Sequence, residues 1–243
     1  MTAKERYAPA IGEKMDQHRR FWAGEGPSLL FVPRRPLDLY DLSGYVERFR
    51  DPARMFEFEL ARARDIADWP TDGIPTIRPS LGTVLIPASV GQEYELREGA
   101  MPWPGAPLSR EEIRALEPDL PHAELMRRAL EFYRLARSPE DEGVGRSSSD
   151  VYAYHGDTQG VFDIAHLLYG TDIFTDLLDD NGRAWVAELM ARCLGWYLES
   201  TRLFKEAIGE PTTEMVHGHG TEQGLYFPTA GARISEDTAT LLS

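Results

Sequence analysis

The sequence predicts an α/β protein made of parallel βα units, arranged as an incomplete (β/α)8 TIM barrel behind an N-terminal helical extension. Short β-branched apolar runs alternate with longer segments of helical period, which is typical of parallel sheets flanked by helices. Three such runs are expected to be strands, with a fourth candidate. A closed barrel needs eight strands over ~250 residues. The N-terminal extension therefore leaves too little chain for a complete barrel.

The extension is assigned to residues 1–72 and contains one well-marked helix. Asp51 is placed to cap that helix, and Pro52 occupies its first position, where a missing N–H costs nothing. Phe56 and Leu60 follow at helical spacing and give the helix a buried stripe.

The barrel-like domain is assigned to residues 73–243. Its expected strands are the β-branched run at 83–86, the run at 151–155 and the segment 212–216. Residues 74–78 are the fourth candidate. We expect these strands to be parallel and to be covered by helices on the outside.

The expected helices carry clear start and stop signals. Ser109 and Glu112 form a capping box. The turn at 156–160 opens another helix. The longest helix is expected over 183–208 and to end at Gly209, a residue type common just after helices.

Composition restricts the possible partners and the compartment. Forty acidic against twenty-six basic side chains give a net charge of −14, which repels nucleic acid and anionic lipid. No stretch approaches the ~18 apolar residues that a membrane helix needs, and the N-terminus lacks the apolar core of a signal peptide. Cys193 is the single cysteine, so no intrachain disulfide can form. These features predict a cytoplasmic protein with no nucleic-acid or membrane partner.

Three blocks of sequence, in order, resemble the uroporphyrinogen decarboxylase superfamily. They are RPSLGTVLIPASVG at 78–91, DTQGVFDIAHLLYG at 157–170 and GARISEDTATLLS at 231–243. The resemblance covers roughly residues 74–243 and implies a TIM barrel. Family members continue through further barrel strands after the point that corresponds to Ser243. The chain is therefore expected to be a fragment, or to be completed by a partner.

The resemblance implies methyl transfer more than decarboxylation. The superfamily's decarboxylases bind pyrrole N–H groups with an aspartate, and Gly82 stands at that position here. The corrinoid methyltransferases of the superfamily resemble the 157–170 block better; they use a corrinoid methyl donor and a zinc-bound thiolate. Their zinc ligands would lie beyond Ser243. The ligand implied is a tetrapyrrole, a corrinoid or a methylated small molecule, with a corrinoid protein as a possible partner. Uroporphyrinogen decarboxylation and a non-catalytic binding subunit remain alternatives.

His155, Asp157 and Gln159 are the candidate catalytic residues. They follow an expected parallel strand, at the end where such folds place their active sites. The alternative is that Asp157 caps the helix beginning at Gln159 and that His155 is a satisfied residue at the rim.

His217, His219 and Tyr226 are candidate substrate-binding residues on one loop. On an extended segment His217 and His219 would project to the same side, as two ligands of a metal such as zinc could. The alternative is a glycine-rich loop with solvated histidines.

Arg78, Ser235 and Asp237 complete the candidate substrate-binding set. Arg78 could hold a ligand carboxylate, or form an ordinary surface ion pair. Ser235 and Asp237 belong to a loop that lines the pocket in the family. Their alternative is a helix start, with Ser235 as its N-cap.

An incomplete barrel also predicts association. A few barrel strands leave an edge of unpaired backbone groups beside apolar side chains, which is normally covered by another chain. Self-association through that edge is therefore expected.

Overall fold

The computed structural model describes residues 9–32, 41–65, 69–137, 150–218, 222–228, 231–232, 237–238 and 240. Its strands form a mixed sheet and a small separate ribbon. In chain order the strands are β1 (Ile74–Ile77), β2 (Tyr94–Glu95), β3 (Trp103–Pro104), β4 (Tyr152–Ala153), β5 (Met215–His217) and β6 (Gln223–Phe227).

The mixed sheet has the strand order β4-β1-β6-β5. β1 and β4 run parallel, with Thr76 opposite Tyr152, whereas β6 is antiparallel to both β1 and β5. The expected parallel barrel is therefore wrong. Only residues 218–222 join β5 to β6. Parallel neighbours need a connection of a dozen or more residues, so this short connection makes an antiparallel hairpin.

The strand expected at 83–86 is also wrong. Thr83 and Val84 lie in a turn, and the helix α5 (Leu85–Ser89) begins directly after it. Val84, Leu85 and Ile86 are all fully buried. A short apolar run that is buried on all sides has no periodicity to separate strand from helix, so its sequence could not decide.

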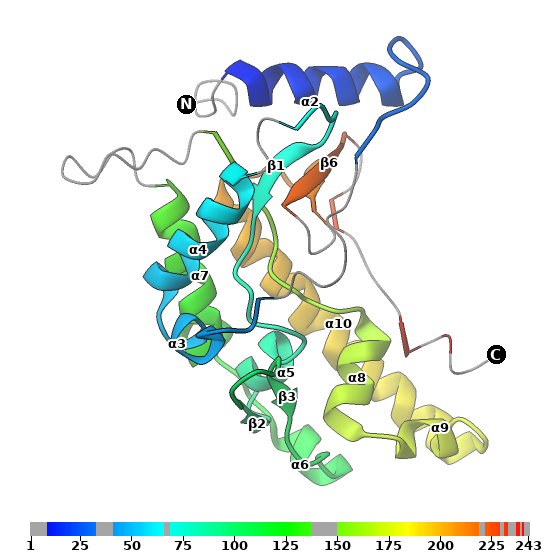
Figure 1. Cartoon of the computed structure of the whole chain (residues 1–243). Helices are drawn as coiled ribbons and strands as arrows, with labels where there is room; N and C mark the ends of the chain where they lie inside the picture. The colour runs from blue at the N-terminus through cyan, green and yellow to red at the C-terminus, as the bar shows by residue number, and fades with distance from the viewer. Residues whose placement is uncertain are drawn as a thin grey trace.

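Helices make up most of the described chain. They are α2 (Pro9–Trp22), α3 (Tyr45–Arg50), α4 (Pro52–Asp65), α5, α6 (Arg110–Ala115), the 3-10 helix η2 (Leu120–His122), α7 (Glu124–Arg137), α8 (Val161–Tyr169), α9 (Asp172–Asp176) and α10 (Asp180–Ile208). Figure 1 shows α2 across one end of the molecule beside β1 and β6, while α8 and α9 lie near the other end along α10.

Several of the expected helix signals are confirmed. Asp51 accepts hydrogen bonds from the backbone at the start of α4. Ser109 and Glu112 form the capping box of α6. α10 ends at Gly209, whose φ of 79° is in the left-handed region that favours glycine. Each of these signals acts within a few residues, which is why the sequence alone reveals it.

The apolar interior consists of two clusters. The first joins the sheet to the N-terminal helices and α7, and includes Ile11, Phe56, Ile77 and Phe132. The second lies between α5, α8 and α10. Because the N-terminal helices contribute to the first cluster, the expected extension 1–72 shares a core with the segment 73–243.

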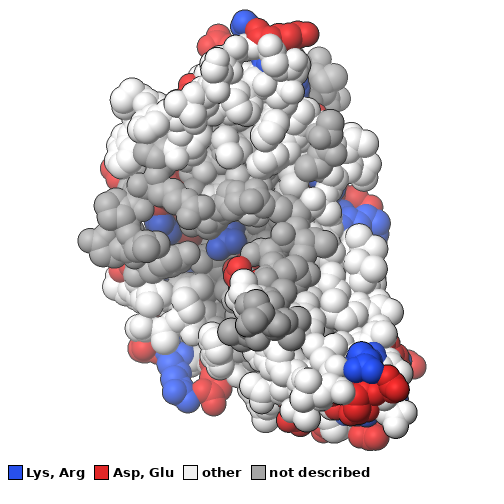
Figure 2. Space-filling view, turned by 90° about the vertical axis from the view of Figure 1, so that its right-hand side faces the viewer, with Lys and Arg blue, Asp and Glu red and all other residues white. Residues whose placement is uncertain are grey.

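The surface carries mixed charge. On the face shown in Figure 2, acidic and basic side chains lie next to one another in small groups, with large uncharged areas between them. Among the described residues, no helix is both long and apolar enough to cross a bilayer.

Candidate functional site

The parallel pairing of β1 and β4 brings their carboxyl ends to one edge of the sheet. Arg78 follows β1 directly, and Asp157 lies four residues beyond β4. Arg78 Nη2 is 3.9 Å from Asp157 Oδ2. Gln159 Nε2 donates a hydrogen bond of 2.5 Å to Asp157 Oδ1. We call Arg78, Asp157 and Gln159 the edge site.

The edge site is neither fully buried nor freely exposed. The side chain of Arg78 retains 18% of its possible exposure and that of Asp157 retains 25%. Water therefore reaches both groups, but it screens their charges less than at an open surface. The Arg78 guanidinium also lies 5.9 Å from the centre of the Tyr154 ring. Arg78 thus forms a partly exposed ion pair with Asp157, beside the Tyr154 ring.

Gln159 has an unusual backbone conformation. Its φ is +56°, and no other non-glycine residue in the described part of the chain has a positive φ. An L-residue in this region costs free energy of the order of 1 kcal/mol, and such strain gathers at functional sites. Helix α8 begins only at Val161, with Gly160 as its N-cap and no side-chain cap. Asp157 therefore does not cap this helix, which was the alternative to a functional role.

His155 points away from the edge site into the interior. Its Nε2 lies 3.2 Å from Oε2 of Glu210, whose carboxylate is fully buried. The Glu210 carboxylate also accepts hydrogen bonds from the Tyr152 hydroxyl at 3.0 Å and from the Val216 backbone N–H at 2.9 Å. We call this the Glu210 network.

Lys205 supplies the charge that balances Glu210. Its Nζ donates to Glu210 Oε2 at 2.7 Å, to Pro211 O at 3.0 Å and to Glu214 O at 2.7 Å. An ammonium group has three N–H donors, and all three are used. Burial raises the pKa of Glu210, but the hydrogen bond from His155 and the charge of Lys205 hold that pKa below its ordinary value. The network is internally satisfied and joins α10, β4 and β5.

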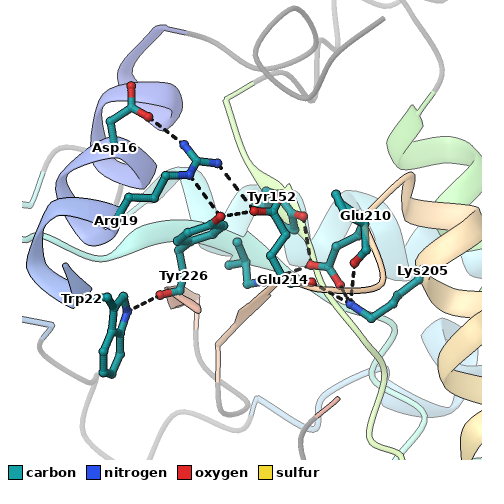
Figure 3. A network of polar contacts seen from close by, with 10 residues as sticks. Asp16, Arg19, Trp22, Tyr152, Lys205, Glu210, Glu214 and Tyr226 are labelled. Carbon is teal, nitrogen blue, oxygen red and sulfur yellow. Dashed lines mark hydrogen bonds and ion pairs between the residues drawn. The ribbon is translucent and has the colours of Figure 1, made fainter. Parts of the chain in front are cut away.

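Tyr226 belongs to an adjoining set of contacts with Arg19 and Glu214 (Figure 3), and the side chains of Arg19 and Asp16 are partly exposed. The Tyr226 hydroxyl accepts from Arg19 Nε at 3.1 Å and donates to Glu214. Arg19 also pairs with Asp16 at 2.7 Å. Burial raises the pKa of Tyr226 to about 12, so its hydroxyl stays protonated and joins α2 to the sheet.

The remaining candidate residues are not brought to the edge site as a group. The His217 ring packs edge-on against Tyr154, at 5.4 Å between ring centres. The backbone N–H of Asp237 donates to the buried Asp163 carboxylate at 3.1 Å, on the first turn of α8. His219 and Ser235 lie outside the described residues.

A metal centre is not assembled by the part of the chain that the structure describes. No group of three or more His, Cys, Asp or Glu side chains there is arranged to hold an ion. The proposed pairing of His217 with His219 stays a prediction.

Three buried polar residues were missed by the sequence reasoning. Glu59, Tyr133 and Glu210 are all buried polar side chains. Glu59 had a signal, because it lies on the helical stripe of Phe56 and Ala63. Burial raises the pKa of Glu59 to about 7, although Arg62 lies 3.7 Å away. Tyr133 and Glu210 depend on partners distant in sequence and had no comparable signal.

Comparison of this chain with protein-family models, with curated proteins and with solved structures finds no match, so the site is interpreted from its own geometry.

Proposed function

We propose that the edge site binds a small polar molecule that carries a carboxylate, and that the chain is an enzyme or part of one. The observation that supports this most is the convergence of Arg78, Asp157 and Gln159 at the carboxyl end of two parallel strands. A guanidinium pairs with a carboxylate through directed hydrogen bonds, while a carboxylate such as Asp157 accepts from an N–H, O–H or S–H group.

Methyl transfer to such a molecule is the reaction that the sequence resemblance favours. A corrinoid, when bound, would supply the methyl group. Arg78 would hold the acceptor's carboxylate, Gln159 would orient Asp157, and Asp157 would accept a hydrogen bond or a proton from the acceptor. The edge site offers one guanidinium, which suits a single carboxylate of a small acceptor. We therefore propose that the corrinoid is carried by a separate protein, in a reducing cytoplasm.

Zinc does not fit the side chains that the structure describes. His217 packs on Tyr154, and His155 is held by Glu210 within a satisfied network.

Uroporphyrinogen decarboxylation is less well supported. An added Cβ at Gly82 would lie 3.0 Å from Pro102 Cγ, so a side chain at this position would crowd its neighbour. One observation favours a non-catalytic binding subunit. The His155 side chain is buried and bonded to Glu210, so it does not face the edge site as a catalytic group would.

Free methylcobalamin, standing in for the protein-bound corrinoid, and mercaptoacetate provide a test. Mercaptoacetate is chosen because it carries both a thiol and a carboxylate. Loss of the methylcobalamin absorbance measures transfer, and ethanethiol serves as the acceptor without a carboxylate. We expect transfer to mercaptoacetate that falls at least tenfold in Arg78→Gln, and little change in the exposed control Arg134→Gln.

Absence of transfer by the unaltered protein would contradict the proposal. Release of CO2 from uroporphyrinogen would then favour the decarboxylase, and inactivity in both assays would favour the non-catalytic subunit.

A further inference from the structure

Tyr133, on α7, makes an unusual pair of hydrogen bonds at the base of the edge site. Its hydroxyl donates to the backbone carbonyl of Tyr154 at 2.9 Å and accepts from the backbone N–H of Gly156 at 2.7 Å. One buried hydroxyl thus bridges the two residues that flank His155. The Tyr133 ring is fixed between Phe132 and Phe204, at 5.9 and 5.5 Å between ring centres.

These bonds lie where the chain leaves the sheet. The Tyr154 N–H still donates to Ile77 O on β1, at 3.0 Å. The next buried backbone groups have left the sheet, and a buried polar group without a partner is costly. The Tyr133 hydroxyl supplies that partner on both sides of the turn. Gly156 allows close packing here, because an added Cβ would lie 2.9 Å from Leu85 Cδ2.

The turn held in this way leads directly to the strained part of the edge site. Gln159 keeps its positive φ only three residues after Gly156, and its side chain holds Asp157. Strained backbone persists when the surrounding structure holds it in place. The buried contacts of Tyr133 and Gly156 support the backbone just before Gln159. The Glu210 network holds the side chain of His155, the residue that precedes Gly156.

We infer that Tyr133 is a positioning residue of the edge site, which fixes Asp157 and Gln159 relative to Arg78 through the backbone of residues 154–156. This inference rests on the proposed function for its consequence in catalysis. The structural part of it can be measured without any ligand.

Hydrogen exchange of the full chain tests the positioning role. In the unaltered protein we expect the Gly156 amide to be protected although it lies outside every helix and strand. Tyr133→Phe should speed exchange of the amides in 156–159 by about tenfold. The matched control is Tyr169→Phe. It also removes a hydrogen-bonded hydroxyl, in this case one that contacts Arg110 and Asp176. It should leave 156–159 unchanged.

The strain at Gln159 allows a second measurement. Gln159→Gly removes the side chain that holds Asp157 and relieves the positive φ, so Tyr133→Phe should lower the methyl-transfer rate much less in this background. Independent, multiplicative effects of the two changes on that rate would overturn the coupling.

The two proposals can fail separately. An unprotected Gly156 amide in the unaltered protein, or equal exchange in Tyr133→Phe and Tyr169→Phe, would overturn the role of Tyr133 even if the enzyme is active. Absence of methyl transfer with the expected exchange pattern would overturn the proposed function alone. Because the first of these measurements uses the unaltered chain, it can overturn the role of Tyr133 even if Tyr133→Phe does not fold.

Discussion

The edge site and the Glu210 network contain Asp157 and His155, which are only two residues apart in the sequence. The two sites are nevertheless opposite in character. His155 enters a fully buried set of groups in which the Lys205 donors and the Glu210 carboxylate are all matched. Asp157 lies at a water-accessible edge, 3.9 Å from its cation and beside a strained residue. Saturated hydrogen bonding favours rigidity, whereas a water-accessible charged group can be reached by a ligand. Two residues that are close in sequence can therefore lie in very different polar environments.

Glu210→Ala is expected to have the largest effect on stability. It leaves the Lys205 ammonium buried without its counter-charge, and breaking a buried pair in this way costs ~3–5 kcal/mol. Urea unfolding measures the loss. The control is Glu206→Ala, which breaks an exposed pair with Arg202 at 2.6 Å near the end of α10 and should cost at most ~1 kcal/mol. Equal losses would remove the distinction between the network and an ordinary surface pair.

Glu59→Gln tests a buried carboxylate whose charge, unlike that of Glu210, is not offset by its surroundings. Its pKa rises from 4.5 in the unfolded chain to about 7 in the fold, so ionisation destabilises the protein as the pH rises through this range. The penalty is absent below pH 4.5 and complete above pH 7. At 1.36 kcal/mol per pKa unit it amounts to up to roughly 3 kcal/mol. The Gln variant should therefore gain stability relative to the unaltered protein at pH 8 but not at pH 4.5.

Glu131→Gln is the matched control for this pH dependence. The hydrogen bond from Arg134 lowers the pKa of Glu131, so its contribution is stabilising above the unfolded pKa and disappears as the pH falls. Its removal should cost a few tenths of a kcal/mol at pH 8, with the opposite sign to Glu59→Gln. The same sign in both variants would contradict the assignment of Glu59 as a desolvated charge.

Asp157→Asn should separate function from stability at the edge site. Because water reaches this side chain, we expect less than ~1 kcal/mol loss of unfolding free energy. We expect at least a tenfold loss of methyl transfer to mercaptoacetate, since an amide cannot take the acceptor's proton. A variant that loses several kcal/mol of stability would show that Asp157 is structural, like Glu210.

Gln159→Gly is expected to have the smallest effect on stability and the opposite sign. Glycine adopts a positive φ without steric cost, and relief of this strain should stabilise the fold by up to ~1 kcal/mol, less the entropy that glycine loses on folding. Thermal unfolding measures the gain. The same variant should lose activity because it no longer holds Asp157. A destabilised Gln159→Gly would mean that its side-chain contact outweighs the backbone strain.

The candidate site was only partly predictable from sequence. Asp157 and Gln159 were identified because they follow a strand, and Arg78 because its guanidinium could hold a ligand carboxylate. The parallel pairing of β1 with β4, which brings the three residues together, was not predicted. His155 follows β4 as well, but the side on which it lies depends on Glu210, fifty-five residues away. Glu59 could have been found from its place on the buried stripe of α4. Tyr133 could not, because its partners are backbone atoms of a distant turn.

The sequence by itself determined the features that act over a few residues. The cap at Asp51, the capping box at Ser109 and the end of α10 at Gly209 are set by local hydrogen bonds and backbone freedom. Only the tertiary structure decided that residues 83–84 form a turn, that a helix begins at Leu85 and that β6 pairs antiparallel with β1. Apolar runs favour burial without fixing strand direction or partner. Those choices depend on contacts between residues far apart in the chain, where the local pattern carries no information.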